Sequence, residues 1–228
     1  ECNMRNPFVF AAFPSWRRVF LDQSKEAQRL VYADRAFRDA FREDLKKPQT
    51  FGNWTRVRVH DVKSAALKQY EGQSVDDVAR AQGKDPIDAF FELVLADDLE
   101  IEFLLSTFNH NVPRMTEILN NRDMLLGLGD GGAHVDMLCD AGYPTFLLGT
   151  WVRERQALTM EEGVRRLTSD PADFFGITDR GRLQVGLAAD IAVFDPATVG
   201  SDNHGERRYD LPGGVKRMVM PSRGILHT

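Results

Sequence analysis

The sequence of 228 residues predicts an α/β fold, and three observations carry that prediction. An apolar run at residues 124–128 ends in a glycine-rich loop with one carboxylate, which is typical of a strand buried on both faces of a parallel sheet. Amphipathic segments with capping residues lie on either side of that run and predict helices. After residue 177 the chain changes to short apolar segments separated by turn residues, which predicts a small β unit.

The elements before the apolar run follow from periodicity and capping residues. Apolar residues at every third or fourth position predict helices that begin at Ser, Asp or Asn. We expect helices at 24–47 (one helix or a pair), 74–83, 85–95 and 111–119. Strands are expected at 56–60 and 101–108.

The elements after the run are helical first and then extended. A capping box at Thr159 and an Asp170-Pro171 helix start that Gly176 closes indicate a helical stretch over about 145–175. The β unit is expected to use segments 181–183, 190–196, 215–220 and 225–227, with a turn at 221–224.

The composition excludes several classes of protein. Hydrophobic residues make up 43% of the chain, enough for a buried core. The net charge of −5 and the scattering of basic residues among acids argue against a nucleic-acid partner. No apolar run approaches the roughly 18 residues of a membrane span, and we expect no membrane partner. Two cysteines, Cys2 and Cys139, provide no disulfide framework, so we expect a cytoplasmic protein.

Asp130, just past the apolar run, is the main chemical candidate. In α/β barrels the catalytic residues lie at the C-terminal ends of strands, which would make Asp130 catalytic. The alternative is that Asp130 lies in a tight turn and caps the next segment. The glycines at 127, 129 and 132 also match a dinucleotide-binding motif. In that motif a helix begins at the last glycine, but here Pro144 follows twelve residues after Gly132. No strand ending in Asp or Glu appears about twenty residues later either, so the dinucleotide-binding interpretation fails on its context.

Histidines are the other candidates. The five histidines show neither H-x-H nor H-E-x-x-H spacing, so the sequence contains no complete metal site. His134 shares the glycine-rich loop with Asp130, and His110 follows the preceding expected strand. Both are therefore candidate active-site residues.

Three longer runs resemble the C-terminal half of amidohydrolases of the N-acyl-D-amino-acid deacylase (D-aminoacylase) type. They are Gly129–His134, Cys139–Thr145 and Trp151–Arg155. The run Asp179–Pro196 is similar to the segment with which many amidohydrolases leave their barrel, and Val219–Ile225 is similar to the last strands of their β-sandwich. The resemblance implies the C-terminal part of a metal-dependent (β/α)8 TIM barrel at 1–177, with an insertion at about 14–98, and β-sandwich strands at 178–228.

The resemblance also implies a function. The expected reaction is zinc-dependent hydrolysis of an amide C–N bond, with N-acyl-D-amino acids as one candidate class of small-molecule substrate. Asp130 would act as general base and acid and as one zinc ligand, with the other ligands expected upstream of Glu1. Gly131 would let substrate approach the backbone, and His134 and His110 would contact it.

Two departures from the family pattern limit this expectation. The H-x-H zinc ligands are absent, so we expect zinc to be absent or weakly bound and this chain alone to be inactive. Where the family has an arginine that clamps the substrate carboxylate, this chain has His134-Val135-Asp136, leaving Arg114, Arg153 and Arg155 as substitutes. The alternative is therefore an inactive fragment or assembly module, a homo-oligomer or a chain that pairs with a missing N-terminal half.

Overall fold

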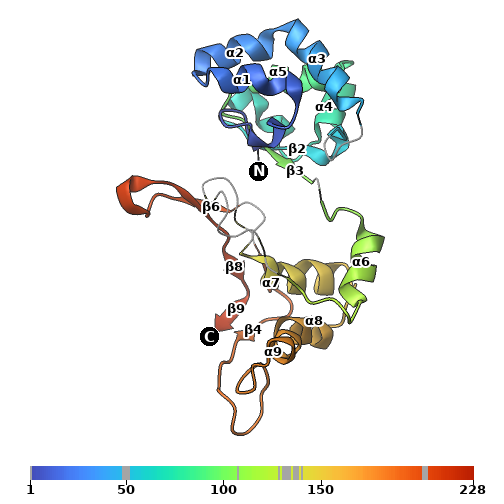
Figure 1. Cartoon of the computed structure of the whole chain (residues 1–228), viewed down its shortest axis with the longest axis vertical. Coiled ribbons are helices and arrows are strands. Elements are labelled where there is room, and N and C mark those ends of the chain that lie inside the picture. Colours follow the sequence, from blue (N-terminus) through green and yellow to red (C-terminus); the bar gives the residue numbers. More distant parts are fainter. Residues whose placement is uncertain are drawn as a thin grey trace. The chain divides into compact units, whose positions relative to one another are not determined.

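A computed structural model describes residues 2–47, 52–106, 108–127, 129, 135, 139, 141–201 and 205–228. The chain divides into two compact units, unit 1 (Glu1–His110) and unit 2 (Asn111–Thr228), and each has its own hydrophobic core (Figure 1). Both helices and strands are present, which confirms the mixed helix and strand content of the predicted fold class. Within the described ranges the strands pair in antiparallel fashion and form no closed barrel.

Unit 1 packs helices against a three-stranded antiparallel sheet of order β1-β3-β2. Its helices are α1 (Arg17–Leu21), α2 (Lys25–Ala33), α3 (Arg35–Leu45), α4 (Val75–Gln82) and α5 (Pro86–Ala96). Its strands are β1 (Cys2–Asn3), β2 (Val57–Asp61) and β3 (Glu102–Leu105). Short 3-10 turns are η1 (Phe8–Phe10), η2 (Pro14–Trp16), η3 (Trp54–Arg56) and η4 (Ala65–Tyr70).

The predicted capping residues set the helix boundaries of unit 1. Ser24 accepts a hydrogen bond from the Ala27 amide and Asp34 from the Ala36 amide, so the expected segment 24–47 is a pair of helices. Gly83, with φ of 64°, ends α4 in the left-handed conformation that glycine tolerates best. These helices and the two expected strands are confirmed.

Aromatic side chains fill the core of unit 1. Phe10 stacks on Trp16 at a centroid distance of 4.2 Å, and Phe41, Phe90 and Phe91 contact this pair edge-on or at a tilt. All five side chains are fully buried. Such contacts add about 0.5–1.5 kcal/mol per pair beyond the burial of apolar area, so this cluster anchors the helices on the sheet.

Unit 2 combines helices with three two-stranded antiparallel ribbons, β4–β9, β5–β8 and β6–β7. Its helices are α6 (Val112–Asn120), α7 (Tyr143–Phe146), the π-helix η5 (Leu147–Glu154), α8 (Met160–Leu167) and α9 (Ser169–Phe175). Its extended elements are β4 (Val193–Phe194), β5 (Gly200–Ser201), β6 (Glu206–Arg208), β7 (Arg217–Val219), β8 (Ser222–Arg223) and β9 (Ile225–His227), with a 3-10 turn η6 (Pro212–Gly214). The helix predicted at 111–119 is confirmed, as is the helical stretch over about 145–175.

The prediction of a strand at the apolar run is wrong for those residues of the run that the structure describes. Residues 124–127 and Gly129 lie in no strand, and Met124 is 45% exposed. A parallel strand needs neighbours that pair with its backbone. Here the Met124 amide instead closes a turn on the Asn121 carbonyl, and the Met124 carbonyl accepts from an arginine side chain. The expected strand at 181–183 is likewise irregular, and β8 replaces part of the expected turn at 221–224.

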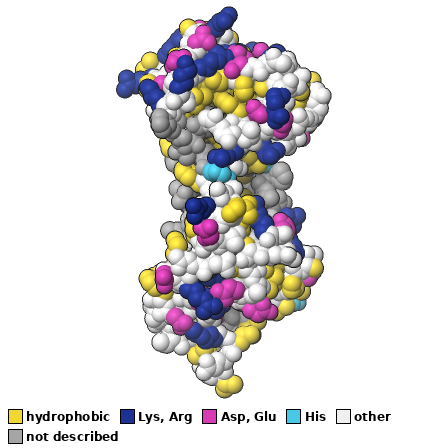
Figure 2. All heavy atoms as spheres, turned by 90° about the vertical axis from the view of Figure 1, so that its right-hand side faces the viewer, with side chains coloured by type: hydrophobic (Ala, Val, Ile, Leu, Met, Phe, Trp, Pro, Cys, Tyr) yellow, Lys and Arg dark blue, Asp and Glu magenta, His cyan; other side chains and the backbone are white. Residues whose placement is uncertain are grey.

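Charges of both signs are mixed on the face of the molecule that Figure 2 shows. There the Lys and Arg side chains are interspersed with Asp and Glu side chains. Many of them form exposed ion pairs, such as Arg80 with Asp76 and Asp77. No helix in the described part of the chain is both long and apolar enough to span a bilayer.

Candidate active site

Three of the four predicted site residues, Asp130, Gly131 and His134, lie outside the described residues. The fourth, His110, is exposed in the segment between β3 and α6 and is the last residue of unit 1. The structure therefore shows the framework around residues 128–134, here called the Asp130 segment, at its two ends in unit 2.

The entry to the Asp130 segment is held by Arg166 of α8. This side chain is only 4% exposed. Its Nη1 donates to the Met124 carbonyl at 2.6 Å, and its Nη2 donates to the Asn121 carbonyl at 2.8 Å. Nη2 also donates to the carbonyls of Ile118 and Leu119 at the end of α6. One guanidinium therefore ties α8 to the last turn of α6 and to the residues that lead to Asp130.

Two further contacts fix the same entry. The Asn120 side-chain amide donates to the Ala157 carbonyl at 3.0 Å, which ties α6 to the linker before α8. Leu126 packs against the core of unit 2, together with Val164 and Leu167 of α8. The path of the chain up to Gly127 is thus defined by hydrogen bonds and by burial.

The exit from the Asp130 segment is held by β7. The Met218 amide donates to the carbonyl of Val135 at 2.6 Å, one residue after His134. Met218 is buried, and β7 pairs with β6. Both ends of the Asp130 segment therefore attach to unit 2, through α8 at one end and β7 at the other.

Close packing joins the β ribbons to the helices of unit 2. At Gly149 of η5 a Cβ atom would lie 2.7 Å from the Val199 carbonyl oxygen. Arg153, one turn further along η5, donates to that same carbonyl. Only glycine allows the backbone before β5 to approach this helix so closely.

The three arginines considered as substrate clamps already have partners within the chain. Arg114 pairs with Glu117 at 2.8 Å and its side chain is 74% exposed. Arg153 binds the Val199 carbonyl and Glu154. The Arg155 guanidinium lies over the Trp151 ring, 4.4 Å from its centroid. These contacts are those of helix-surface residues.

Neighbouring arginines stabilise the charged form of Glu162 on α8. Hydrogen bonds from Arg165 hold the pKa of the Glu162 carboxyl below its usual range, and the charges of Arg122 and Arg166 act in the same direction. Glu162 thus remains ionised near Arg166 without a direct hydrogen bond to it in the described contacts.

A zinc site is not formed by the described residues. Within these ranges, no group of three His, Cys, Asp or Glu side chains gathers in a way that could bind a metal ion. Asp130 and His134 fall outside them. The described residues alone do not fit a zinc ion.

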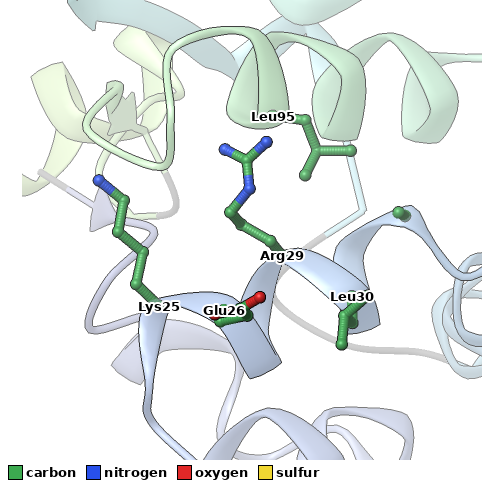
Figure 3. Close-up of a pocket in the computed structure, with 6 residues that line it drawn as sticks. Lys25, Glu26, Arg29, Leu30 and Leu95 are labelled. Atoms are coloured by element: carbon green, nitrogen blue, oxygen red, sulfur yellow. The ribbon is translucent and has the colours of Figure 1, made fainter.

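A surface pocket in unit 1 offers no alternative catalytic centre. It is lined by residues of α2 and by Leu95 of α5, and Lys25 and Arg29 project from α2 on the same side (Figure 3). Lys25 pairs with Asp98 at 2.5 Å and with Glu100 at 3.4 Å, and Arg29 also pairs with Asp98, so both cations have carboxylate partners within the chain. A second depression beside α6 and α8 is lined by Arg122, Arg153 and Glu162 among others and likewise contains no cluster of catalytic groups.

Arg166 and Met218 were not predicted from the sequence. A main-chain contact such as that of Met218 leaves no signal in residue type. The sequence gives one weak indication for Arg166. It lies three residues after Gly163 and therefore on the same side of α8, the side that the structure shows to be buried. The adjacent Arg165 makes the pair look like an ordinary solvated charge cluster.

Comparisons with known proteins cover most of this framework. A profile described as the amidohydrolase family matches residues 25–216. An uncharacterized protein of Mycobacterium tuberculosis is 30% identical over 202 residues, which cover 83% of this chain and 32% of the relative. A D-aminoacylase of Alcaligenes xylosoxydans xylosoxydans is 31% identical over 149 residues, which cover 64% of this chain and 29% of that protein.

A solved structure is also similar in sequence. An N-acyl-D-glutamate deacylase from Bordetella bronchiseptica, complexed with zinc and a phosphonate inhibitor, is 25% identical, with a TM-score of 0.33. The match covers 76% of this chain and 33% of that one. The chain spans about a third of the length of the curated relatives first matched.

Proposed function

The chain belongs to the amidohydrolase family and resembles D-aminoacylase, and on that premise we propose that it contributes Asp130 to a zinc-dependent site that hydrolyses the amide bond of N-acyl-D-amino acids. The observation that carries the proposal is the extent of the family match. Residues 25–216 include Asp130 and the anchor Arg166. The match stops two residues before Met218, the anchor at the exit.

The chemistry assigned to Asp130 is proton transfer. Its carboxylate takes a proton from the attacking water and delivers it to the leaving nitrogen, a role that needs one carboxylate within hydrogen-bond reach of both atoms. When bound, zinc lowers the pKa of a water molecule toward neutrality. Zinc is the metal that the resemblance implies, and Asp130 is proposed as one of its ligands.

The neighbours of Asp130 are assigned to the substrate. Gly131 permits close approach of substrate to the backbone. His134, in the same segment, and His110 are proposed to contact the substrate. Because Arg114, Arg153 and Arg155 have partners within the chain, the proposal assigns the recognition of the substrate carboxylate to none of them.

The domain assignment belongs to the same proposal. Residues 1–177 are assigned to a TIM barrel with an insertion at about 14–98, and residues 178–228 to a β-sandwich. The separate aromatic core of unit 1 supports a part that packs on its own, but that part is wider than the expected insertion, because Phe10 and Phe103 of this core lie outside 14–98. The antiparallel ribbons β4–β9, β5–β8 and β6–β7 support a terminal β domain.

The test combines metal analysis with an amidase assay on two samples: the 228-residue chain alone, and the chain together with a polypeptide that supplies the H-x-H zinc ligands, here called the completed protein. Because the H-x-H ligands are absent from the chain, we expect it to bind little or no zinc and to be inactive alone. We expect the completed protein to bind stoichiometric zinc and to turn over N-acetyl-D-amino acids in preference to their L enantiomers. A completed protein that is metal-free and inert would overturn the proposal. It would support the second candidate, a non-catalytic assembly module, which is favoured by the large exposed apolar side chains Phe174, Phe175, Leu183 and Val185.

A further inference from the structure

We propose that Arg166 is a positioning residue for the proposed reaction: its guanidinium holds residues 118–124, which lead along the chain to Asp130, so that turnover through Asp130 depends on α8. This inference rests on the proposed function for its catalytic consequence. The anchoring itself can be measured without any assay of activity.

The contacts show why Arg166 controls this entry. Its two terminal nitrogens reach four backbone carbonyls, those of Ile118, Leu119, Asn121 and Met124. The last of these lies six residues before Asp130. The set spans the end of α6 and the turn that follows it, so a single rigid group fixes both.

Burial increases the energetic cost of losing these contacts. Arg166 is 4% exposed, and water cannot easily replace a lost donor at this depth. The carbonyls at the end of α6 carry the partial negative charge of a helix C-terminus, which compensates the guanidinium without a direct carboxylate contact in the described residues. Nε of Arg166 is buried and has no hydrogen-bond partner in the described part of the structure.

The neighbouring Arg165 provides a matched control. It lies on the same helix, but its guanidinium binds the carboxylates of Glu162 and Asp170 and its side chain is 34% exposed. Replacing Arg165 removes the same charge from α8. It leaves all four carbonyl contacts of Arg166 intact.

Hydrogen exchange of the intact chain tests the anchoring. The reporters are the amides of Asn121, Asp123 and Met124, which donate to the Ile118 carbonyl, the Asn121 side chain and the Asn121 carbonyl. We expect Arg166→Met to speed exchange in a peptide covering 119–127 at least tenfold, Arg166→Lys to restore most of the protection, and Arg165→Met to change it less than twofold. Equal exchange in Arg166→Met and Arg165→Met would overturn the anchoring.

A kinetic cycle on the completed protein tests whether Arg166 acts through Asp130. A misplacement of about 1 Å can cost about 100-fold in rate. We therefore expect Arg166→Met to lower kcat about 100-fold with KM within about threefold of wild type, and Arg166→Lys to recover much of kcat. In an Asp130→Asn background, Arg166→Met should lower the residual rate no further. Full additivity of the two losses would overturn the positioning role.

The two failures are distinguishable. If the wild-type completed protein does not turn over the substrate, the proposed function fails, while the exchange of residues 119–127 still decides whether Arg166 anchors the entry. If Arg166→Met only lowers the melting temperature and both exchange and kcat of the folded protein stay unchanged, the side chain is merely structural and the inference is wrong.

Discussion

The Cys2 thiol in unit 1 is a buried group whose ionisation is coupled to folding. Burial raises its pKa from 9.0 to about 12. The folded chain therefore keeps this proton between about pH 9 and pH 12, while the unfolded chain loses it. Because the unfolded state binds fewer protons in this range, the free energy of unfolding must fall as the pH rises from 9 to 12, and Cys2 makes no contribution to pH dependence below about pH 8.

Urea unfolding at pH 8, 9.5 and 10.5 measures this coupling. We expect the wild-type chain to lose stability more steeply with pH than a Cys2→Ala variant. Burial and, secondarily, the charge of Cys2 raise the pKa of Tyr32, so the difference in slope reports Cys2 together with its coupling to Tyr32. Parallel slopes would contradict the buried, protonated thiol.

At the residue scale, sequence reasoning finds chemical types better than supporting contacts. Asp130 stands out because a lone carboxylate among glycines follows an apolar run. Arg166 does not stand out, because its role depends on four main-chain carbonyls that the sequence does not mark. Arg165 and Arg166 are adjacent and identical in type, and only the structure separates a surface ion pair from a buried anchor.

At the scale of elements, local chemistry predicts helices well. The caps at Ser74, Asp85 and Thr159 each accept the hydrogen bond from a first-turn amide that the sequence pattern implies. The run at residues 124–128 shows the limit of this reasoning. Apolar character favours a buried strand, but pairing depends on distant partners, and the Met124 carbonyl finds the Arg166 guanidinium instead.

Gly149 in η5 allows a prediction about the packing of this helix. Replacing glycine by alanine in a helix normally stabilises it by about 1 kcal/mol. Here the new Cβ would meet the Val199 carbonyl oxygen at 2.7 Å and the Gly200 Cα at 3.0 Å, and backbone atoms cannot rotate away. We expect Gly149→Ala to destabilise unit 2 by about 1–3 kcal/mol in chemical denaturation.

The control for Gly149 is Gly127, where a Cβ would meet nothing within 4 Å and φ is not in the left-handed region. Gly127→Ala should change the free energy of unfolding by less than about 0.5 kcal/mol. A stabilising Gly149→Ala would show that β5 does not pack against η5 as described.

At the scale of the whole molecule, the chain has two hydrophobic cores. The aromatic core of unit 1 and the core of unit 2 around Leu147, Leu148, Trp151 and Val152 share no residues. We expect two unfolding transitions in calorimetry. Phe91→Ala opens a cavity among five aromatic rings. It should lower the free energy of unfolding of unit 1 by about 3–5 kcal/mol and so move the transition of unit 1 to a lower temperature.

Gly149→Ala should lower the temperature of the transition of unit 2 and leave that of unit 1 unchanged. A single transition that both substitutions lower equally would contradict the independence of the two cores.

The fold was predictable from the sequence to the level of α/β content and of individual helices. Strand pairing was not, because partners such as β1 and β3 are about 100 residues apart and their register depends on packing. The β unit near the end of the chain was predictable as a region, since its turn residues recur at short intervals. Its individual strands, two or three residues long, fall below what alternation can define.

The central claim is that Asp130 transfers the proton in amide hydrolysis. The most direct measurement is kcat of the completed protein for an N-acetyl-D-amino acid, in wild type and in Asp130→Asn. The matched control is Asp123→Asn, the same exchange of carboxylate for amide at an exposed position seven residues earlier. We predict that wild type and Asp123→Asn turn over at similar rates and that Asp130→Asn falls by about 1000-fold. Turnover of Asp130→Asn within threefold of wild type, or no turnover by wild type, would contradict the account.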